Sequence, residues 1–340
     1  TEHPSESFLK KLDHQFGISS PRDSGFNTVQ TIQEMESESV RVFMAMGGNF
    51  ARATPDSSRT EEALKKCDLT VQVTTKLNKS HLAHGKKALI LPCLGRSELD
   101  VQASGEQSVT VEDSMGAVHA SKGTNQPASA HLKSEVAIVA GMAKATFPEN
   151  QKMWRALQDD YRLIRDKIEA VLPELFSDYN KKINQPGGFR LFNSAAARKW
   201  NTKTGKARFI SKPLQLLQLP TGQLRLMTIR SHDQYNTTVY GMNDRYRGIF
   251  GTRRVILMNS KDMESLGIEH GQEVVIQSHM EDGRKRQVSG FHAVRYDIPQ
   301  GCAASYFPET NELIAVEYCA DRSFTPISKL IPVTVHKSTD

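Results

Sequence analysis

Long apolar runs are missing from this 340-residue sequence. No run approaches the roughly 20 residues that a helix needs to cross a bilayer, so we expect neither a membrane-spanning segment nor a membrane partner. The start, Thr1-Glu2-His3-Pro4, lacks an initiator Met and the pattern of a secretory signal peptide. We therefore expect a processed chain or a piece of a longer one. The composition, 38% hydrophobic and 24% charged, is typical of a folded globular protein, and the length suits two domains.

Cysteine is scarce as well. None of the four cysteines belongs to a Cys-x-x-Cys pair or has a histidine at the spacing of a zinc site. An iron–sulfur cluster needs several thiolates brought together, so we expect no cluster and no metal ligand in this chain. The pattern predicts structural thiols in a reducing compartment, the cytoplasm. The cysteines are Cys67, Cys93, Cys302 and Cys319.

Motifs that carry catalytic side chains are also missing. The sequence has no nucleophile elbow, no His-Glu-x-x-His and no EF-hand loop. The adjacent carboxylates Asp159-Asp160 and Glu281-Asp282 are expected on solvated faces. The residues alone therefore nominate no catalytic acid, base or nucleophile.

The formal net charge of +6 has no single focus. The densest basic cluster, Arg284-Lys285-Arg286, follows two carboxylates, so we interpret it as a solvated hairpin, with phosphate contact as the alternative. The other basic residues are spread along the chain without an aromatic platform. We therefore expect no nucleic-acid partner.

What the sequence does contain is an alternation of strand and helix over residues 40–92. An apolar strand over 40–46 ends at a glycine pair, and a second strand over 69–73 alternates apolar and polar residues. Between them, Ser58 and Glu61 have the spacing of a capping box at a helix start. A third strand over 88–91 ends at a proline. This order predicts a parallel sheet with crossover connections.

The next region changes character twice. Residues 95–130 are rich in Gly, Ser, Asp and Gln, and we expect an irregular excursion that includes short strands at most. Amphipathic helices are predicted over 134–146 and, as one long helix, over 153–172.

From about residue 206 the pattern is β-rich. A short helix over 262–266 should end at Gly267, and Asp282-Gly283 marks a hairpin turn. Several short strands with turn signals indicate a small barrel. The predicted strands cover residues 224–229, 254–258, 273–278 and 287–294.

Two polar segments are candidate binding sites. Gly47-Gly48-Asn49 follows a strand and precedes a helix, where a backbone without side chains can approach a phosphate. A plain tight turn is the alternative, because the spacing is no dinucleotide or P-loop fingerprint. The second segment, 230–238, offers almost every type of hydrogen-bonding group and suits a ligand such as a pterin or guanine, or else a solvated connector.

Arginines follow the second segment. One hypothesis is that they are available for bidentate phosphate contact, and ordinary surface charge is the alternative. The four are Arg245, Arg247, Arg253 and Arg254.

The order of several motifs resembles the formate-dehydrogenase-like molybdopterin oxidoreductases. Met46-Gly47-Gly48-Asn49-Phe50 is similar to that family's Gly-x-Asn-Pro turn, with Phe50 in place of Pro. Residues 88–92 resemble its Asp-Val-Val-Leu-Pro strand, and 265–274 resemble its Leu-Gly-Ile…Gly-Asp-x-Val segment. Residues 75–82, Thr-Lys-Leu-Asn-Lys-Ser-His-Leu, stand where many relatives have Thr-Glu-Thr. The resemblance runs from about residue 35 to 336.

The resemblance implies an α/β fold in two domains. Residues 1–205 would form the second half of a Rossmann-like domain, with 97–130 reaching toward a cluster domain. Residues 206–340 would form a molybdopterin dinucleotide-binding β-barrel of double-psi type. The implied cofactor-binding residues are Gly47, Gly48, Asn49, Asn78, Ser80, Arg230, His232, Asn236, Thr237, Thr238, Asn311 and Lys329.

The implied cofactor is bis-molybdopterin guanine dinucleotide carrying molybdenum. The family's 4Fe-4S cluster, its molybdenum ligand and its catalytic residues would lie in N-terminal domains outside this chain. A small-molecule redox substrate, those N-terminal domains and an electron-transfer protein would be the partners. The competing hypothesis is a free-standing, non-catalytic module that binds a nucleotide or pterin.

Overall fold

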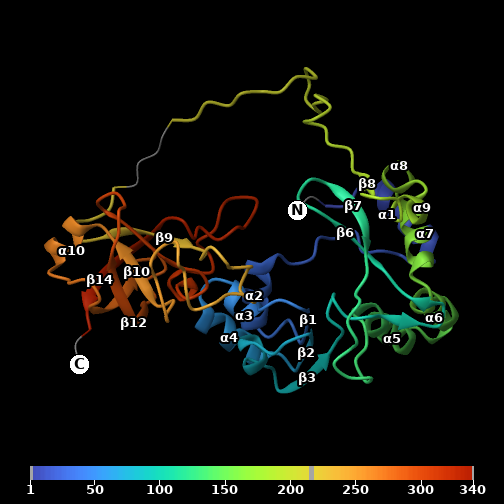
Figure 1. Ribbon diagram of the computed structural model, residues 1–340, viewed down its shortest axis with the longest axis horizontal. Coiled ribbons are helices and arrows are strands. Elements are labelled where there is room, and N and C mark those ends of the chain that lie inside the picture. Colours follow the sequence, from blue (N-terminus) through green and yellow to red (C-terminus); the bar gives the residue numbers. More distant parts are fainter. Residues whose placement is uncertain (1–2, 214–217, 339–340) are drawn as a thin grey trace. The chain divides into compact units, whose positions relative to one another are not determined.

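The computed structural model describes residues 3–213 and 218–338 (Figure 1). These residues form two compact units. The first unit combines residues 3–24 with 92–213, and the second combines residues 25–91 with 218–338. The predicted domains, 1–205 and 206–340, divide the chain elsewhere and stay a prediction.

The second unit begins with a three-stranded sheet. Its strands, in spatial order, are β1 (Val42–Met46), β2 (Leu69–Thr74) and β3 (Lys87–Pro92). β1 and β2 run parallel, and α3 (Phe50–Ala53) and α4 (Ser57–Lys66) lie between them in the chain. The predicted strand–helix–strand unit is confirmed, since parallel neighbours require such a crossover.

The two faces of this sheet differ. On one face, α2 (Thr28–Glu36) and α4 contribute to a buried cluster against which Phe43 of β1 packs. The alternate residues of β1 point the other way, and Val42, Met44 and Met46 are 58%, 38% and 42% exposed. Parallel sheets are normally covered on both faces. Within the described part of this unit, the second face of β1 has no covering layer.

Six strands of the same unit close into a barrel. Around the barrel their order is β10-β12-β11-β14-β9-β13. Two neighbouring pairs are parallel, β9 with β13 and β10 with β12, and the other four are antiparallel. This is the predicted double-psi type of barrel, and its closure removes unpaired strand edges. The strands are β9 (Leu224–Ile229), β10 (Val255–Met258), β11 (Glu273–Ser278), β12 (Arg286–Arg295), β13 (Cys302–Tyr306) and β14 (Ile331–Lys337).

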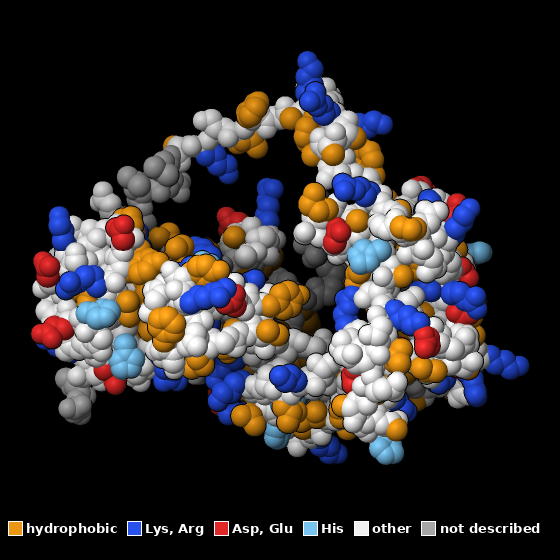
Figure 2. Space-filling model, viewed as in Figure 1, with side chains coloured by type: hydrophobic (Ala, Val, Ile, Leu, Met, Phe, Trp, Pro, Cys, Tyr) orange, Lys and Arg blue, Asp and Glu red, His pale blue; other side chains and the backbone are white. Residues whose placement is uncertain are grey.

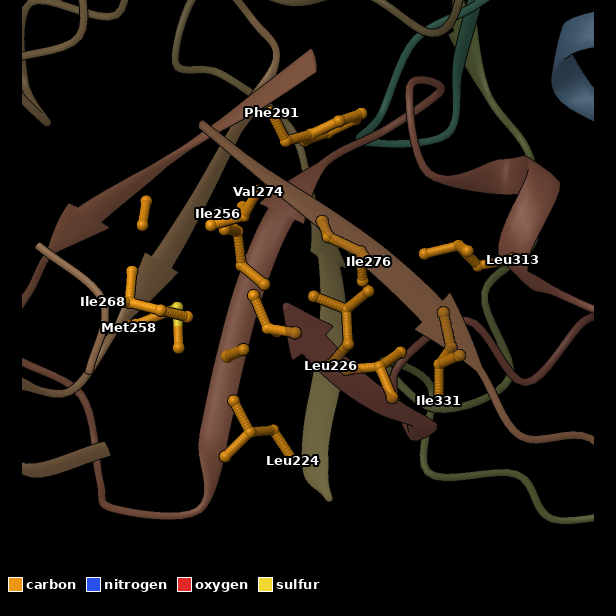
Figure 3. Close-up of a cluster of buried hydrophobic side chains, with 14 of the residues drawn as sticks. Leu224, Leu226, Ile256, Met258, Ile268, Val274, Ile276, Phe291, Leu313 and Ile331 are labelled. Carbon is orange, nitrogen blue, oxygen red and sulfur yellow. The ribbon is translucent and has the colours of Figure 1, made fainter. Parts of the chain in front are cut away.

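Alternate residues of these strands point into the barrel and form its core (Figure 3). Each such side chain stabilises the fold by about 1.5–3 kcal/mol when fully buried. The helix α10 (Ser260–Leu266) adds Met263 and ends, as predicted, at Gly267. Inward-facing members include Leu224, Leu226, Ile256, Met258, Val274, Ile276, Phe291 and Ile331.

The sequence patterns predict four of the six barrel strands and miss β13 and β14. β13, Cys-Ala-Ala-Ser-Tyr, has no β-branched residue, and β14 contains Pro332, which cannot donate to a strand ladder. In the barrel the carbonyl of Pro332 still accepts a hydrogen bond from the N–H of His279 at 2.9 Å. Pairing within the closed barrel thus completes two strands that the sequence patterns did not mark.

The first unit is mainly helical. α1 (Glu6–Phe16) packs on α7 (Tyr161–Val171), and α5 (Glu135–Thr146) packs on α6 (Gln151–Asp159). The polar region 95–130 contains short strands, as expected. The remaining elements are β4 (Val101–Gln102), β5 (Gly105–Glu106), β6 (Val109–Glu112), β7 (Ala117–Ser121), η2 (Pro148–Asn150), α8 (Pro173–Phe176), α9 (Tyr179–Lys182) and β8 (Phe189–Arg190).

The prediction of one long helix over 153–172 is wrong. The chain makes two helices, α6 and α7, because Asp160 between them is extended, with φ −148° and ψ 109°. The carboxylate of Asp160 accepts a hydrogen bond from the N–H of Arg162 at 2.9 Å and so caps the second helix. Apolar periodicity continues across the break, which is why the pattern did not reveal it.

The predicted capping box at Ser58 and Glu61 is also wrong. Asp56 occupies the N-cap position of α4, and its side chain makes no cap bond. The N–H of Ser58 instead donates to the carboxylate of Glu312 at 2.8 Å. A tertiary contact therefore replaces the local one.

Residues 192–213, which follow β8, are all exposed. They include six Lys and Arg residues and no Asp or Glu, and several of these cationic side chains are visible in Figure 2. Basic charge therefore does have a focus, contrary to the sequence-based expectation of an even spread. None of the helices formed by residues 3–213 and 218–338 has the length and apolar character needed to span a membrane.

Candidate functional site

The glycine turn follows the carboxyl end of β1. Gly47 and Gly48 both have left-handed backbones, with φ of +66° and +72°, a conformation that suits glycine. The N–H of Gly47 donates to Val73 of β2 at 2.7 Å. A Cβ built on either glycine would meet no atom within 4 Å, so space is open above the turn. The N–H groups of Gly48 and Asn49 find no acceptor among the described residues.

Asn49 and Ser80 hold the turn in place. Asn49 is 6% exposed; its side-chain N–H donates to the carbonyl of Thr237 at 3.2 Å, and its oxygen accepts from the Ser80 hydroxyl at 2.9 Å. That hydroxyl also accepts from the N–H of Ala51 at 2.9 Å. The amide of Asn49 thus joins the glycine turn to the polar loop at residues 230–238.

Asn78 supports the same turn from the other side. It caps the short helix η1 (Lys79–Leu82) by accepting from the N–H of Ser80 at 3.0 Å. Its side-chain N–H donates to the carbonyl of Gly48 at 2.8 Å. The side chains of Asn49, Asn78 and Ser80 are therefore occupied in shaping the turn, which leaves backbone N–H groups to meet a ligand.

The polar loop at 230–238 is ordered by its own side chains. Arg230 donates to the side-chain oxygen of Asn236 at 2.8 Å, and Asn236 has a left-handed backbone with φ +49°. Gln234 donates to the carbonyls of Asn236 at 2.7 Å and Phe307 at 2.6 Å. Thr237 is 5% exposed, whereas Thr238 is exposed. This is a fixed, hydrogen-bonded structure and not a loose solvated connector.

A buried carboxylate lies behind this loop. Asp244 has a side chain 1% exposed and accepts hydrogen bonds from His232 at 3.0 Å, Arg247 at 2.5 Å and Tyr306 at 2.9 Å. Burial opposes ionisation of this carboxyl, but the three donors outweigh burial and lower its pKa below the usual range. His232 also packs against the ring of Tyr246, with ring centroids 4.4 Å apart. An ionised Asp244 therefore orients His232.

The four arginines after the loop do not form one set. Arg253 is 3% exposed and pairs with Glu309 at 2.6 Å, and it also donates to Gln234 at 2.9 Å. It is thus neither a surface charge nor free for phosphate. Arg247 is committed to Asp244, whereas Arg245 and Arg254 lie on the surface with weaker contacts.

The last two predicted residues come from barrel connections. Asn311, 2% exposed, begins the short helix η3 (Asn311–Leu313), and its side chain donates to the carbonyl of Arg52 at 2.7 Å. The Lys329 ammonium donates to the carbonyl of Thr228. Burial and the nearby charge of Arg230 lower the pKa of Lys329. Asn311 therefore binds the α/β segment (residues 25–91), and Lys329 lies beside the polar loop.

Two clusters of predicted residues thus lie side by side. The glycine turn with its supports touches the polar loop through Asn49 and Thr237, and Lys329 adjoins that loop. Over residues 3–213 and 218–338, no three His, Cys, Asp or Glu side chains converge to hold a metal ion. The arrangement offers backbone N–H groups beside polar and cationic side chains, a chemistry suited to phosphate and heterocycle recognition.

Sequence reasoning missed Asp244, Arg286 and Glu309. Arg286 was expected on a solvated hairpin, yet it is 3% exposed and pairs with Asp56 at 2.7 Å and Asp282 at 2.6 Å. No local signal separates such a residue from surface charge. Its partner Asp56 is 230 positions away in the chain.

Comparisons with known proteins find similarity both for the barrel and for the whole chain. Residues 224–333 fit the family model described as Molydopterin dinucleotide binding domain. The match begins in β9 and ends in β14, so it covers most of the barrel and its loops. Acetylene hydratase from Pelobacter acetylenicus is similar in fold, with a TM-score of 0.64 over 98% of this chain and 50% of that one. Its sequence identity is 14%.

Two curated relatives are much closer in sequence. An uncharacterized oxidoreductase from Mycobacterium tuberculosis (strain ATCC 25618 / H37Rv) is 50% identical over 334 residues, 96% of this chain and 43% of that protein. Protein YdeP from Escherichia coli (strain K12) is 44% identical over 344 residues, 99% of this chain and 45% of that protein. The chain spans less than half the length of these relatives. The matched family model supports the barrel as a molybdopterin dinucleotide-binding domain, and the first of the two relatives is named an oxidoreductase.

Proposed function

We propose that this chain is the C-terminal, cofactor-binding part of a formate-dehydrogenase-like oxidoreductase that uses molybdenum bis-molybdopterin guanine dinucleotide. The observation that carries the proposal is the contact between the glycine turn and the polar loop of the barrel. It puts a site for an anion next to a site for a flat heterocycle, and a pterin dinucleotide combines both kinds of group.

The turn suits a phosphate. Its two N–H groups without acceptors, at Gly48 and Asn49, follow a β-strand at the edge where open α/β sheets bind ligands. The open space above both glycines lets an anion approach the backbone closely. A Cβ at this place would fill that space.

The loop suits a heterocycle. Pterin and guanine present rows of donors and acceptors, and the free groups here are of matching kinds. Thr238 is exposed, Arg230 uses one nitrogen on Asn236, and the Nε2 atom of His232 is not used in the bond to Asp244. A polar loop held this rigidly loses little conformational entropy when it binds.

Bound molybdenum cofactor would supply two-electron redox chemistry, while the chain's own residues would bind and orient it. We propose that the substrate-binding residues, the molybdenum ligand and a 4Fe-4S cluster belong to another part of a longer parent protein. The chain covers 43–45% of the relatives' length, and the uncovered face of β1 provides an apolar surface for further chain to pack on. The four cysteines are free, which supports a cytoplasmic location.

Replacing Gly48 tests the phosphate site. In the complete protein that contains this chain, Gly48→Val should lower the retained molybdopterin and guanine nucleotide by about tenfold or more, because a branched side chain blocks the anion. Gly271→Val is the matched control, since Gly271 also has a positive φ, +83°, and open surroundings but lies away from the turn. Pterin fluorescence after oxidation and nucleotide release on acid hydrolysis measure the content. A parent protein without pterin or nucleotide would overturn the proposed function.

Replacing Asn236 tests the heterocycle site. Asn236→Ala should weaken cofactor retention by about ten- to a hundredfold, equivalent to about 1–3 kcal/mol. Asn236→Gly removes the same amide and tolerates φ +49° without strain, so it separates the lost hydrogen bond from backbone effects. Equal cofactor content in both variants and the parent would argue against this loop as the pterin contact.

A further inference from the structure

A buried ion pair joins the segment that carries the glycine turn to the barrel. Arg286 begins β12 and is 3% exposed. Its Nε and Nη2 atoms donate to one oxygen of Asp56 at 2.9 and 2.7 Å, and its Nη1 and Nη2 atoms donate to Asp282 at 2.9 and 2.6 Å. Asp282 belongs to the same hairpin as Arg286. The bonds between Arg286 and Asp56 therefore join the barrel to the α/β segment, whereas the bonds to Asp282 stay within the barrel.

The backbone around Asp56 is held against the barrel as well. Asp56 has a left-handed backbone with φ +50°, a conformation that most side chains avoid and that glycine, asparagine and aspartate adopt more readily. Its N–H donates to the carbonyl of Asn311 at 2.9 Å. Glu312 accepts from the N–H of Ser58 two residues later at 2.8 Å. Asp56 is thus the point at which this segment is fixed.

A short rigid path leads from Asp56 to the turn. The helix α3 occupies residues 50–53, directly after Asn49 and three residues before Asp56. Its N-terminal end is fixed by the bond between the N–H of Ala51 and the Ser80 hydroxyl. Its C-terminal end is fixed by Asn311, which donates to the carbonyl of Arg52. The short helix α3 therefore connects Asp56 to the glycine turn through a segment that is hydrogen-bonded at both ends.

A buried ion pair is a weak source of net stability, because desolvation offsets much of the attraction. Its geometry is nevertheless demanding, since the guanidinium must stay in register with its carboxylate. Such a pair suits the fixing of a distance between two parts of a site.

We propose that the Arg286–Asp56 pair is a positioning contact that sets the spacing between the glycine turn and the polar loop at residues 230–238. The ligand whose binding depends on this spacing has two ends, because a nucleotide diphosphate is joined to a heterocycle. This inference rests on the proposed function. A ligand that reaches only one of the two sites would not depend on the pair.

Two isosteric variants test the pair with matched chemistry. Asp56→Asn and Asp282→Asn each remove one negative charge from the same guanidinium, and asparagine tolerates the left-handed backbone of Asp56. Both are made in the complete protein, and the rate at which pterin dinucleotide is released after gel filtration is measured beside the melting temperature. We expect Asp56→Asn to release the dinucleotide about tenfold faster, whereas Asp282→Asn should stay within about twofold of the parent.

Three further variants guard against a purely structural effect. Arg286→Lys keeps the charge and should recover part of the retention that Arg286→Gln loses. Arg165→Gln removes another buried arginine, 7% exposed and bonded to Asn180 and the carbonyl of Ser108, from the first compact unit. It should lower stability without changing dinucleotide release.

The outcomes are distinguishable. Equal release from Asp56→Asn and Asp282→Asn overturns the positioning role, and so does release that follows melting temperature across all variants, Arg165→Gln included. If the parent retains the dinucleotide and Asp56→Asn retains it equally well, only this inference fails. If the parent retains none, the proposed function itself fails.

Discussion

Asp244 shows how one buried side chain can organise several exposed ones. It is the common acceptor for His232, Arg247 and Tyr306, which come from three places along the chain. The sequence contains Asp244 in a polar stretch with four arginines, and nothing local marks it as buried. His232 could be nominated because it lies in a dense polar motif. The carboxylate that orients His232 can be identified only from the folded structure.

The pKa of Asp244 gives a prediction with a definite sign. Burial opposes ionisation, but its three donors lower the folded-state pKa below the unfolded value of about 3.9. The stabilisation is therefore fully present above the unfolded pKa and is lost as pH falls through the folded one. Asp244→Asn should lower the free energy of unfolding by about 1–3 kcal/mol at pH 7, and the difference from the parent should shrink toward pH 3.

Urea unfolding of parent and variant across this pH range measures the difference. The exposed carboxylate of Asp297, replaced by Asn, serves as the control in the same barrel. If the difference in the free energy of unfolding between the parent and Asp244→Asn stays constant from pH 7 to pH 3, the charge of Asp244 is not what stabilises the loop.

Among the elements, those whose ends are marked by local chemistry were predicted best. α10 begins at Asn259, whose side chain accepts from the N–H of Lys261, and ends at Gly267 with φ +65°. Both signals act within a few residues. The cap of α4 and the strands β13 and β14 depend on partners elsewhere in the fold, so windowed patterns could not reveal them.

The end of α10 supports a test of this local signal. Gly267→Ala should destabilise the barrel unit by about 1 kcal/mol, because alanine pays for the left-handed backbone that glycine adopts freely. Gly241→Ala is the matched control, since Gly241 lies in the same unit and has no positive φ. Thermal unfolding followed by circular dichroism compares the two. Equal melting temperatures would contradict the assigned cap.

At the scale of the molecule, the barrel is not alone in its unit. Val316, from a barrel connection, is fully buried in the cluster formed by α2 and α4. The ion pair of Arg286 with Asp56 and the bond from Asn311 to Arg52 link the same two parts. These contacts tie residues 25–91 to the barrel. Residues 25–91 and 218–338 should unfold together.

Trypsin can test this directly. Residues 192–213 are exposed and rich in Lys and Arg, so cleavage should occur there first. Because residues 25–91 bind the barrel, the two fragments should elute together from a gel-filtration column and separate only in denaturant. Separate elution without denaturant, or first cleavage between residues 273 and 294, would contradict the shared unit.

The sequence by itself determined the fold class and the outline of the site. Period-two strands, a strand–helix–strand order and turn residues are local, and motif order along the chain carried the resemblance to molybdopterin oxidoreductases. Gly47, Gly48 and the polar loop at 230–238 could be nominated because their residue types are unusual for their position. These signals need only neighbours in the chain.

The tertiary structure decided which side chains serve the ligand and which serve the protein. Asn49, Asn78, Ser80 and Asn311 were nominated for binding, yet their amides and hydroxyl are spent on other parts of the fold. Arg286 resembled surface charge in the sequence and became the buried link between two distant segments. Burial and hydrogen-bond pairing are properties of the packed chain, because they depend on groups brought together from positions far apart.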